Sequence, residues 1–196
     1  MNAYILAGGK SERMNKDKAF LKYNGKHFID LLIETIAQIF DRVHIVGRIY
    51  AHPLVKESIL DDVQDIGPLG GIYTALKHTD RSFNFFTAID YPLITSEIIL
   101  FLAQELLQNP YEYYGIIPVT PDGAHPLFAF YSRSCLASIE KCIEEKSYQI
   151  LCISRYCKIL FLNLKSKMAD RDFNRMKKCF TNINSDEEYK TLKKFK

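Results

Sequence analysis

Residues 3–14 read AYILAGGKSERM, and this stretch decides the fold. A short apolar run, Ala3–Leu6, leads within two residues to the pair Gly8-Gly9, and further apolar runs recur at intervals that leave room for helices between them. In an open parallel sheet, ligands bind beyond the carboxyl ends of the strands. We therefore expect a glycine-rich binding loop at the end of a first, buried strand.

Four more apolar runs have the length of strands and are bounded by polar or turn residues: Val43–Val46, Ser58–Leu60, Phe83–Ile89 and Tyr114–Val119. Between them, apolar side chains at helical spacing predict three helices. One helix should span residues 28–40, a second should begin after Thr95-Ser96, and a third should run from Gly70-Gly71 to about Lys77. Strands alternating with helices are typical of a parallel sheet covered on both faces.

The pattern changes in the last third of the chain. The segment Thr120-Pro121-Asp122-Gly123 reads as a turn between Ile116–Val119 and Leu127–Tyr131, which predicts an antiparallel hairpin. The spacing of Ser185 and Glu188 is that of a capping box, so a terminal helix should begin there. The expected fold class is α/β: a three-layer, Rossmann-like, mostly parallel sheet with an antiparallel hairpin, forming one domain over residues 1–196.

Composition narrows the classes of function. The chain has 196 residues, 47% of them hydrophobic, and a net charge of only +3. It lacks the clustered basic face that nucleic-acid binding requires, and no apolar stretch approaches membrane-spanning length. The N-terminus has no signal-peptide pattern, so we expect a cytoplasmic protein.

The five cysteines are odd in number, lie in the last third of the chain and form no C-x-x-C pair. We expect reduced, mostly buried thiols rather than disulfides or a zinc site.

The opening loop has the chemistry of an anion site. Gly8 and Gly9 allow backbone N–H groups to approach phosphate oxygens, Arg13 offers a planar fork of donors, and Lys18 offers a compact charge. The Walker A motif is excluded because Tyr4 stands where it needs a glycine, and the dinucleotide motif G-x-G-x-x-G is also absent.

Residues 6–19, LAGGKSERMNKDKA, resemble the signature of molybdenum cofactor guanylyltransferases. The resemblance implies that the loop, with Leu6, Ala7, Gly8 and Gly9, wraps the triphosphate of a nucleotide that Lys18 also binds. One position differs: the residue after Met14 is usually glycine in that family, and here it is Asn15. Asparagine tolerates positive φ better than other non-glycine residues.

Residues 61–72, DDVQDIGPLGGI, are similar to the acidic residue and Gly-Pro-Leu segment of the same family. The resemblance implies nucleotide contacts at Gly67, Pro68 and Leu69, and at Asp62, with Asp61 as the open alternative. A carboxylate there can accept hydrogen bonds from the N1–H and N2–H groups of guanine.

The apolar run Phe85–Ile89 ends in Asp90-Tyr91-Pro92, which resembles the family's Asp-x-Pro. This match implies that Asp90 binds Mg²⁺ and nucleotide, and that Arg13, Lys18 and Asp90 are the catalytic residues. Magnesium takes one or two carboxylates together with substrate phosphates, so one well-placed aspartate is sufficient.

Two final segments, His125–Tyr131 and Asn182-Ile183-Asn184, resemble the part of the family that holds the second substrate. The resemblance implies that Asn182, Asn184 and Arg13 contact molybdopterin, while we read His125 as a structural or positioning residue.

Taken over the whole chain, the resemblance implies a fold like that of nucleotide-diphospho-sugar transferases, with a nucleotide half over about residues 1–110 and a second-substrate half over about 111–196. The implied reaction transfers GMP from GTP to the terminal phosphate of the molybdenum-molybdopterin cofactor, with Mg²⁺, and releases pyrophosphate. Molybdoenzymes, their chaperones and cofactor-insertion proteins are the implied partners.

Alternative functions remain open at this stage. The cytidylyltransferase for the same cofactor typically reads Leu-Ala-Ala-Gly where this chain has Leu6-Ala7-Gly8-Gly9. Another small-molecule nucleotidyltransferase, such as one acting on a sugar 1-phosphate, is a further alternative. A non-catalytic module that binds an acidic partner through the lysine-rich C-terminus is the alternative from a different class.

Overall fold

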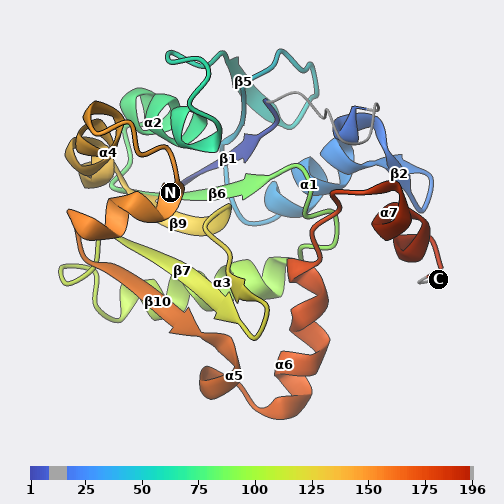
Figure 1. Ribbon diagram of the computed structural model, residues 1–196. Helices are drawn as coiled ribbons and strands as arrows, with labels where there is room; N and C mark the ends of the chain where they lie inside the picture. The colour runs from blue at the N-terminus through green and yellow to red at the C-terminus, as the bar shows by residue number, and fades with distance from the viewer. Residues whose placement is uncertain (9–16, 195–196) are drawn as a thin grey trace.

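The computed structural model describes residues 1–8 and 17–194, and an eight-stranded sheet runs through its centre (Figure 1). The strands of this sheet are β1 (Asn2–Leu6), β4 (Val43–Val46), β5 (Val55–Ile59), β6 (Phe83–Ala88), β7 (Gly115–Thr120), β8 (Gly123–Ala124), β9 (Phe128–Ser132) and β10 (Ile159–Asn163). A separate two-stranded hairpin consists of β2 (Lys22–Tyr23) and β3 (Lys26–His27).

The helices of the described part are α1 (Phe28–Ile36), α2 (Pro68–His78), α3 (Ser96–Leu107), α4 (Leu136–Glu144), α5 (Leu164–Lys167), α6 (Asp170–Met176) and α7 (Asp186–Leu192). Short 3-10 helices are η1 (Lys18–Phe20), η2 (Arg133–Cys135), η3 (Ile150–Arg155) and η4 (Lys177–Phe180).

The strand order is β10-β7-β9-β6-β1-β4-β5, and β8 pairs with β7. Strand β1 is parallel to both β4 and β6, β4 is parallel to β5, and β10 is parallel to β7, whereas β9 is antiparallel to its neighbours β6 and β7. The predicted mixed sheet is therefore confirmed. The predicted hairpin turn after β7 is closed by β8, and β9 then inserts between β6 and β7.

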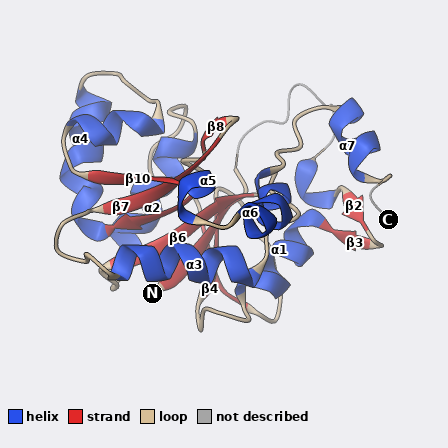
Figure 2. Ribbon diagram, turned by 90° about the horizontal axis from the view of Figure 1, so that it is seen from below, coloured by secondary structure: helices blue, strands red, loops and turns tan. Residues whose placement is uncertain are grey.

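Helices cover both faces of the sheet, so the predicted three-layer α/β architecture is confirmed (Figure 2). Helices α1, α3 and α6 bury apolar side chains against one face, and α2 and α4 bury theirs against the other. On α1 the buried positions are Phe28, Ile29, Leu32, Ile33 and Ile36, which form one stripe at helical spacing. This stripe is the sequence pattern from which the helix was predicted.

Some element boundaries differ from the predictions for local reasons. Helix α2 begins at Pro68, before the predicted Gly70-Gly71, because Gly67 caps it with φ of 62° and proline suits the first helical turn. Strand β5 begins at Val55, and its start was hidden because Lys56 and Glu57 are exposed on this edge strand. The predicted capping box at Ser185 is confirmed, with both reciprocal hydrogen bonds to Glu188 present.

The prediction of reduced cysteines is wrong for one pair. Cys142 of α4 and Cys152 of η3 form a disulfide, whereas Cys135, Cys157 and Cys179 are free. The two bonded cysteines are ten residues apart, and only the packing of η3 against α4 brings them together. In the described part of the chain, no helix is both long and apolar enough to cross a membrane.

Candidate active site

The start of the glycine-rich loop is anchored between two strands. Ala7 N–H donates to the Val46 carbonyl oxygen at 2.8 Å, and Ile89 N–H donates to the Leu6 carbonyl oxygen at 3.2 Å. The loop therefore leaves the sheet between the carboxyl ends of β4 and β6. Gly8 is the last described residue before positions 9–16. The predicted site residues Gly9 and Arg13, together with Asn15, lie outside the described residues.

Gly8 packs closely against Gly47, which directly follows β4. Gly47 has φ of 86°, and a Cβ added there would lie 2.5 Å from Gly8 Cα, so this position requires glycine. A Cβ added to Gly8 would lie 3.3 Å from Asp61 Oδ2. The segments that contain Gly8, Gly47 and Asp61 thus meet at the start of the loop. Gly47 was not predicted as a site residue because a lone glycine after a strand is a common feature.

The two adjacent aspartates after β5 have different surroundings. Asp62 accepts a hydrogen bond from Lys77 Nζ at 2.8 Å, and this bond lowers its pKa. Asp61 Oδ1 is buried with no hydrogen-bond partner among the described residues, and burial, then repulsion from Asp62, raises its pKa. Asp61 is therefore the aspartate that lies against Gly8, whereas Asp62 is paired with Lys77 of α2.

The predicted nucleotide-binding residues Gly67, Pro68 and Leu69 lie at the start of α2. Gly67 and Pro68 are exposed at the start of the helix, while the Leu69 side chain is buried in the core beneath α2. A Cβ on Gly70 would lie 2.8 Å from the Val63 carbonyl oxygen, so the first turn of α2 packs tightly on the loop that follows the aspartates. Leu69 as a whole residue is 0% exposed, so neither its side chain nor its main chain is open to solvent in this structure.

Lys18 brings together three groups that the sequence predicted separately. Its Nζ donates to Asn184 Oδ1 at 2.6 Å and lies 3.6 Å from Asp90 Oδ2. The side chains of Lys18 and Asp90 are only 15% and 14% exposed, so their charges interact with little screening by solvent. The nucleotide-loop lysine, the predicted metal carboxylate and one of the predicted second-substrate asparagines thus form one cluster.

Asp90 follows β6 by two residues and is incompletely paired. Its Oδ1 is buried without a hydrogen-bond partner in the described part of the chain. Burial raises the pKa of this carboxyl, and the charge of Lys18 opposes the shift. An unpaired buried acceptor is costly unless a ligand supplies the missing interaction.

The Asn182-Ile183-Asn184 segment is fixed beside Asp90. Ile183 N–H donates to the Asp90 carbonyl oxygen at 3.0 Å, and Asn184 N–H donates to Glu188 Oε2 at 2.6 Å. Asn182 Oδ1 is a further buried acceptor with no partner within the described residues. The capping box of α7 thus positions Asn184, and the backbone bond places Asn182 next to the carboxylate.

Arg48 lies next to this cluster, although the sequence did not predict it as a site residue. Its Nη2 lies 2.7 Å from Asp17 Oδ2, and its guanidinium stacks over the Phe20 ring at 5.7 Å. Asp17 in turn caps η1 by accepting from Ala19 N–H at 3.0 Å, and η1 carries Lys18. A lone arginine after a strand gives no sequence signal, so only the tertiary structure reveals this link.

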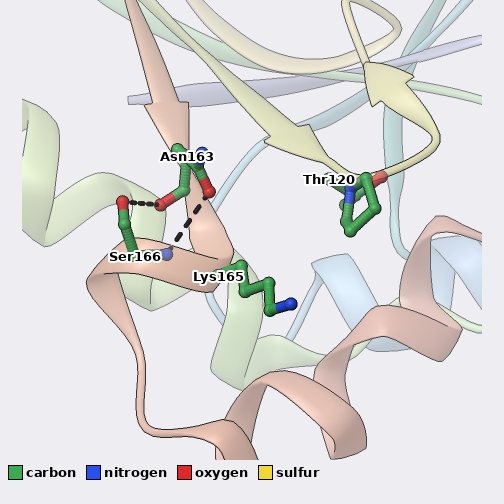
Figure 3. Close-up of a pocket in the computed structure, with 5 residues that line it drawn as sticks. Thr120, Asn163, Lys165 and Ser166 are labelled. Atoms are coloured by element: carbon green, nitrogen blue, oxygen red, sulfur yellow. Dashed lines mark hydrogen bonds between the residues drawn. The ribbon is translucent and has the colours of Figure 1, made fainter.

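His125 lies in a packed setting. Its Nε2 is 2.8 Å from Thr120 Oγ1, its ring lies against Phe180 at 4.6 Å, and burial lowers its pKa. These contacts are those of a side chain that links the end of β7 to η4. Nearby, a cavity of about 310 Å³ lies at the carboxyl ends of β7 and β10 (Figure 3). It is lined by Thr120, Pro121, Asn163, Lys165 and Ser166, none of which was predicted as a site residue.

Residues 3–156 match the family model described as "MobA-like NTP transferase domain". The chain is 33% identical to a Flavobacterium johnsoniae protein named probable molybdenum cofactor guanylyltransferase, over 98% of this chain and 96% of the relative. It is 32% identical to the molybdenum cofactor guanylyltransferase of Syntrophotalea carbinolica, over 96% of this chain and 88% of the relative.

Among solved structures, the chain resembles molybdopterin-guanine dinucleotide biosynthesis protein A from Archaeoglobus fulgidus, with a TM-score of 0.82, 24% identity, and coverage of 99% and 97% of the two chains. It also resembles 2-C-methyl-D-erythritol 4-phosphate cytidylyltransferase from Thermus thermophilus, with a TM-score of 0.66, 11% identity, and coverage of 98% and 97%. At these identities the likeness shows a shared fold, which is the nucleotide-diphospho-sugar-transferase-like fold expected from the sequence.

Proposed function

The chain belongs to the MobA-like NTP transferase family, alongside relatives named molybdenum cofactor guanylyltransferase, and we propose that it transfers GMP from GTP to the terminal phosphate of the molybdenum-molybdopterin cofactor. The products are the guanine dinucleotide form of the cofactor and pyrophosphate. In this proposal the whole chain is one nucleotidyltransferase domain, with a nucleotide half over about residues 1–110 and a second-substrate half over about residues 111–196.

One observation carries the proposal: Lys18 contacts both Asp90 and Asn184. These residues come from the loop after β1, the end of β6 and the segment before α7, which are far apart in the sequence. A reaction between a nucleotide and a second anionic substrate needs both held at one point, with positive charge between them. The position of Lys18 supports that arrangement.

The transfer requires no protein nucleophile. An oxygen of the molybdopterin phosphate attacks the α-phosphorus of GTP, a new P–O bond forms, and the bond to the β-phosphate oxygen breaks as pyrophosphate leaves. Both substrates are anions at neutral pH, so the obstacles are their mutual repulsion and the charge that builds on the leaving group. In the proposal, Lys18, Arg13 and the loop N–H groups of Gly8 and Gly9 offset this charge.

Asp90 is the residue that would hold Mg²⁺. The described residues contain no group of three or more His, Cys, Asp or Glu side chains arranged for a metal, but magnesium in such sites takes few protein ligands and completes its shell with water and phosphate. The unpaired Oδ1 of Asp90 fits that need, and Asn182 Oδ1 is a neutral oxygen nearby. When bound, the cation would neutralise phosphate charge.

For the base, we propose that Asp61 rather than Asp62 contributes the side-chain carboxylate. Asp61 Oδ2 lies beside Gly8 and Asp61 Oδ1 has no hydrogen-bond partner among the described residues, whereas Asp62 is engaged by Lys77. A free carboxylate oxygen can accept from the N1–H or N2–H group of guanine. The exposed residues Gly67 and Pro68, followed by Leu69, would complete that edge with Leu6 and Ala7.

The decisive experiment offers GTP, CTP and ATP separately, each with molybdopterin and Mg²⁺, and measures pyrophosphate. We expect release with GTP at least tenfold faster than with CTP or ATP. A preference for CTP would replace guanylyl transfer by cytidylyl transfer. An absence of turnover with all three nucleotides would favour a non-catalytic module.

The remaining expectations follow from this function. Molybdoenzymes, their chaperones and cofactor-insertion proteins are the proposed recipients of the product, and the proposed location is the cytoplasm. A pull-down using product-loaded protein would identify the recipients.

A further inference from the structure

Four of the five cysteines lie along two neighbouring segments on the face of the sheet covered by α2 and α4. Cys135 precedes α4 and Cys142 lies within it, while Cys152 lies in η3 and Cys157 follows it. Cys142 and Cys152 form the disulfide, and the sulfur atoms of Cys135 and Cys157 are 3.9 Å apart. The outer pair therefore encloses the inner, bonded pair, because the two segments run past each other in opposite directions.

The outer pair is close enough for a second bond. A disulfide has an S–S distance of about 2.05 Å, so the two sulfurs need to approach by roughly 2 Å, within reach of a small side-chain rotation. Cys135 is fully buried, whereas Cys157 is partly exposed. A small oxidant in solvent therefore reaches Cys157 first.

The two thiols also differ in acidity. The hydrogen bond with Cys135 lowers the pKa of Cys157 to about 7. The same hydrogen bond, together with burial, raises the pKa of Cys135. The thiolate is the nucleophilic form of cysteine, so Cys157 is the reactive member of the pair and Cys135 the resolving one.

We propose that Cys157 and Cys135 are a dithiol modification site that hydroperoxides oxidise to a second disulfide. The Cys157 thiolate attacks an oxygen of hydrogen peroxide, which forms a sulfenic acid as the O–O bond breaks and hydroxide leaves. The Cys135 sulfur then attacks the Cys157 sulfur, its proton passes to the departing hydroxyl group, and water leaves. In total, two thiols and one peroxide give one disulfide and two waters.

The second bond would tie together the starts of two strands. The Tyr114 carbonyl oxygen accepts from the Cys135 thiol at 3.2 Å, and Tyr114 N–H donates to the carbonyl oxygen of Lys158, the neighbour of Cys157. Tyr114 immediately precedes β7, and Lys158 immediately precedes β10. Since β7 runs in the same direction as β6, these starts lie at the opposite edge of the sheet from Asp90. Oxidation should therefore change stability and leave nucleotidyl transfer unchanged, and the inference does not depend on the proposed function.

Trypsin makes the test direct, because its sites separate the four cysteines into peptides 134–141, 142–146, 147–155 and 156–158. The full chain is treated with a small excess of hydrogen peroxide near pH 7, alkylated, digested without reductant and mapped by mass spectrometry. We expect a linked 134–141/156–158 product, loss of two of the three free thiols, and a rise in Tm on the order of 5 °C.

Three variants complete the experiment. Cys157→Ser should abolish the linked product, Cys135→Ser should leave Cys157 as a sulfenic acid that dimedone traps, and Cys179→Ser should behave as wild type because Cys179 is remote and buried with a raised pKa. The proposal is overturned if wild-type protein keeps three free thiols, or if Cys157 is oxidised to the sulfinic acid while Cys135 remains a free thiol. These outcomes need no nucleotide, so they are independent of the transferase assay.

Discussion

Arg48 Nη2 lies 2.7 Å from Asp17 Oδ2, and this ion pair joins the end of β4 to the turn that carries Lys18. Asp17 uses its other carboxylate oxygen to cap η1, so one side chain serves both contacts. From this arrangement we propose that Arg48 is a positioning residue that acts on Lys18 through Asp17.

Replacing Arg48 with methionine should therefore weaken catalysis without unfolding the protein. We expect kcat/KM for GTP to fall roughly tenfold, since misplacing a charged group costs part of its electrostatic effect. Arg48→Lys should restore part of the loss, because a lysine can still reach Asp17. Arg42→Met is the matched control, since Arg42 pairs with exposed Asp80 at the start of β4. Equal losses in Arg48→Met and Arg42→Met would argue against positioning.

Asp90→Asn should abolish most turnover. Loss of the carboxylate removes the proposed magnesium ligand, and losing one such electrostatic contact commonly costs roughly two to three orders of magnitude in rate. Steady-state kinetics over a range of Mg²⁺ concentrations would show this loss together with a higher Mg²⁺ requirement. Circular dichroism serves to check that the variant folds. Near-normal turnover at low Mg²⁺ would remove Asp90 from the site.

Asp61→Asn and Asp62→Asn should change stability in opposite directions. Burial raises the folded-state pKa of Asp61 above 3.8, so ionising it costs stability as pH rises through the window between 3.8 and that raised value. Asp61→Asn should thus raise the urea midpoint near pH 7, and the gain should shrink as pH falls through that window and be lost below about 3.8. Asp62→Asn loses the hydrogen bond from Lys77 and should lower the midpoint slightly, because the pair is largely exposed.

The same two variants also distinguish the roles of Asp61 and Asp62 in GTP binding. Asp61→Asn should weaken GTP binding in a calorimetric titration by about tenfold, the usual scale for one hydrogen bond to a charged group. Asp62→Asn should bind GTP nearly as well as wild type. The reverse order of affinities would return the base contact to Asp62.

Asn184→Ala should affect the second substrate more than the nucleotide. Asn184 is the hydrogen-bond partner of Lys18, and its position is set by Glu188 of the capping box. We expect KM for molybdopterin to rise roughly tenfold and KM for GTP to change by less than about threefold. Asn174→Ala, on the exposed face of α6, is the control. Equal increases in both KM values would assign Asn184 to positioning Lys18 instead.

Local patterns in the sequence were sufficient for the elements that carry the strongest signal. The stripe on α1, the apolar strands and the capping box of α7 each depend on residues within a few positions of one another, and their predicted types are confirmed. The resemblance to a family also pointed to Lys18, Asp90 and Asn184, and the structure brings these three side chains together.

The sequence by itself thus determined the α/β class, the order of the main elements and the family. Tertiary structure alone decided which of two adjacent aspartates lies against Gly8, how Arg48 reaches Asp17, and which cysteines meet. The physical reason is distance along the chain: Lys18 and Asn184 are 166 positions apart in the sequence, and Cys135 and Cys157 are 22 positions apart. Such contacts arise only when the sheet and its helices pack, and periodicity or spacing within one segment carries no information about them.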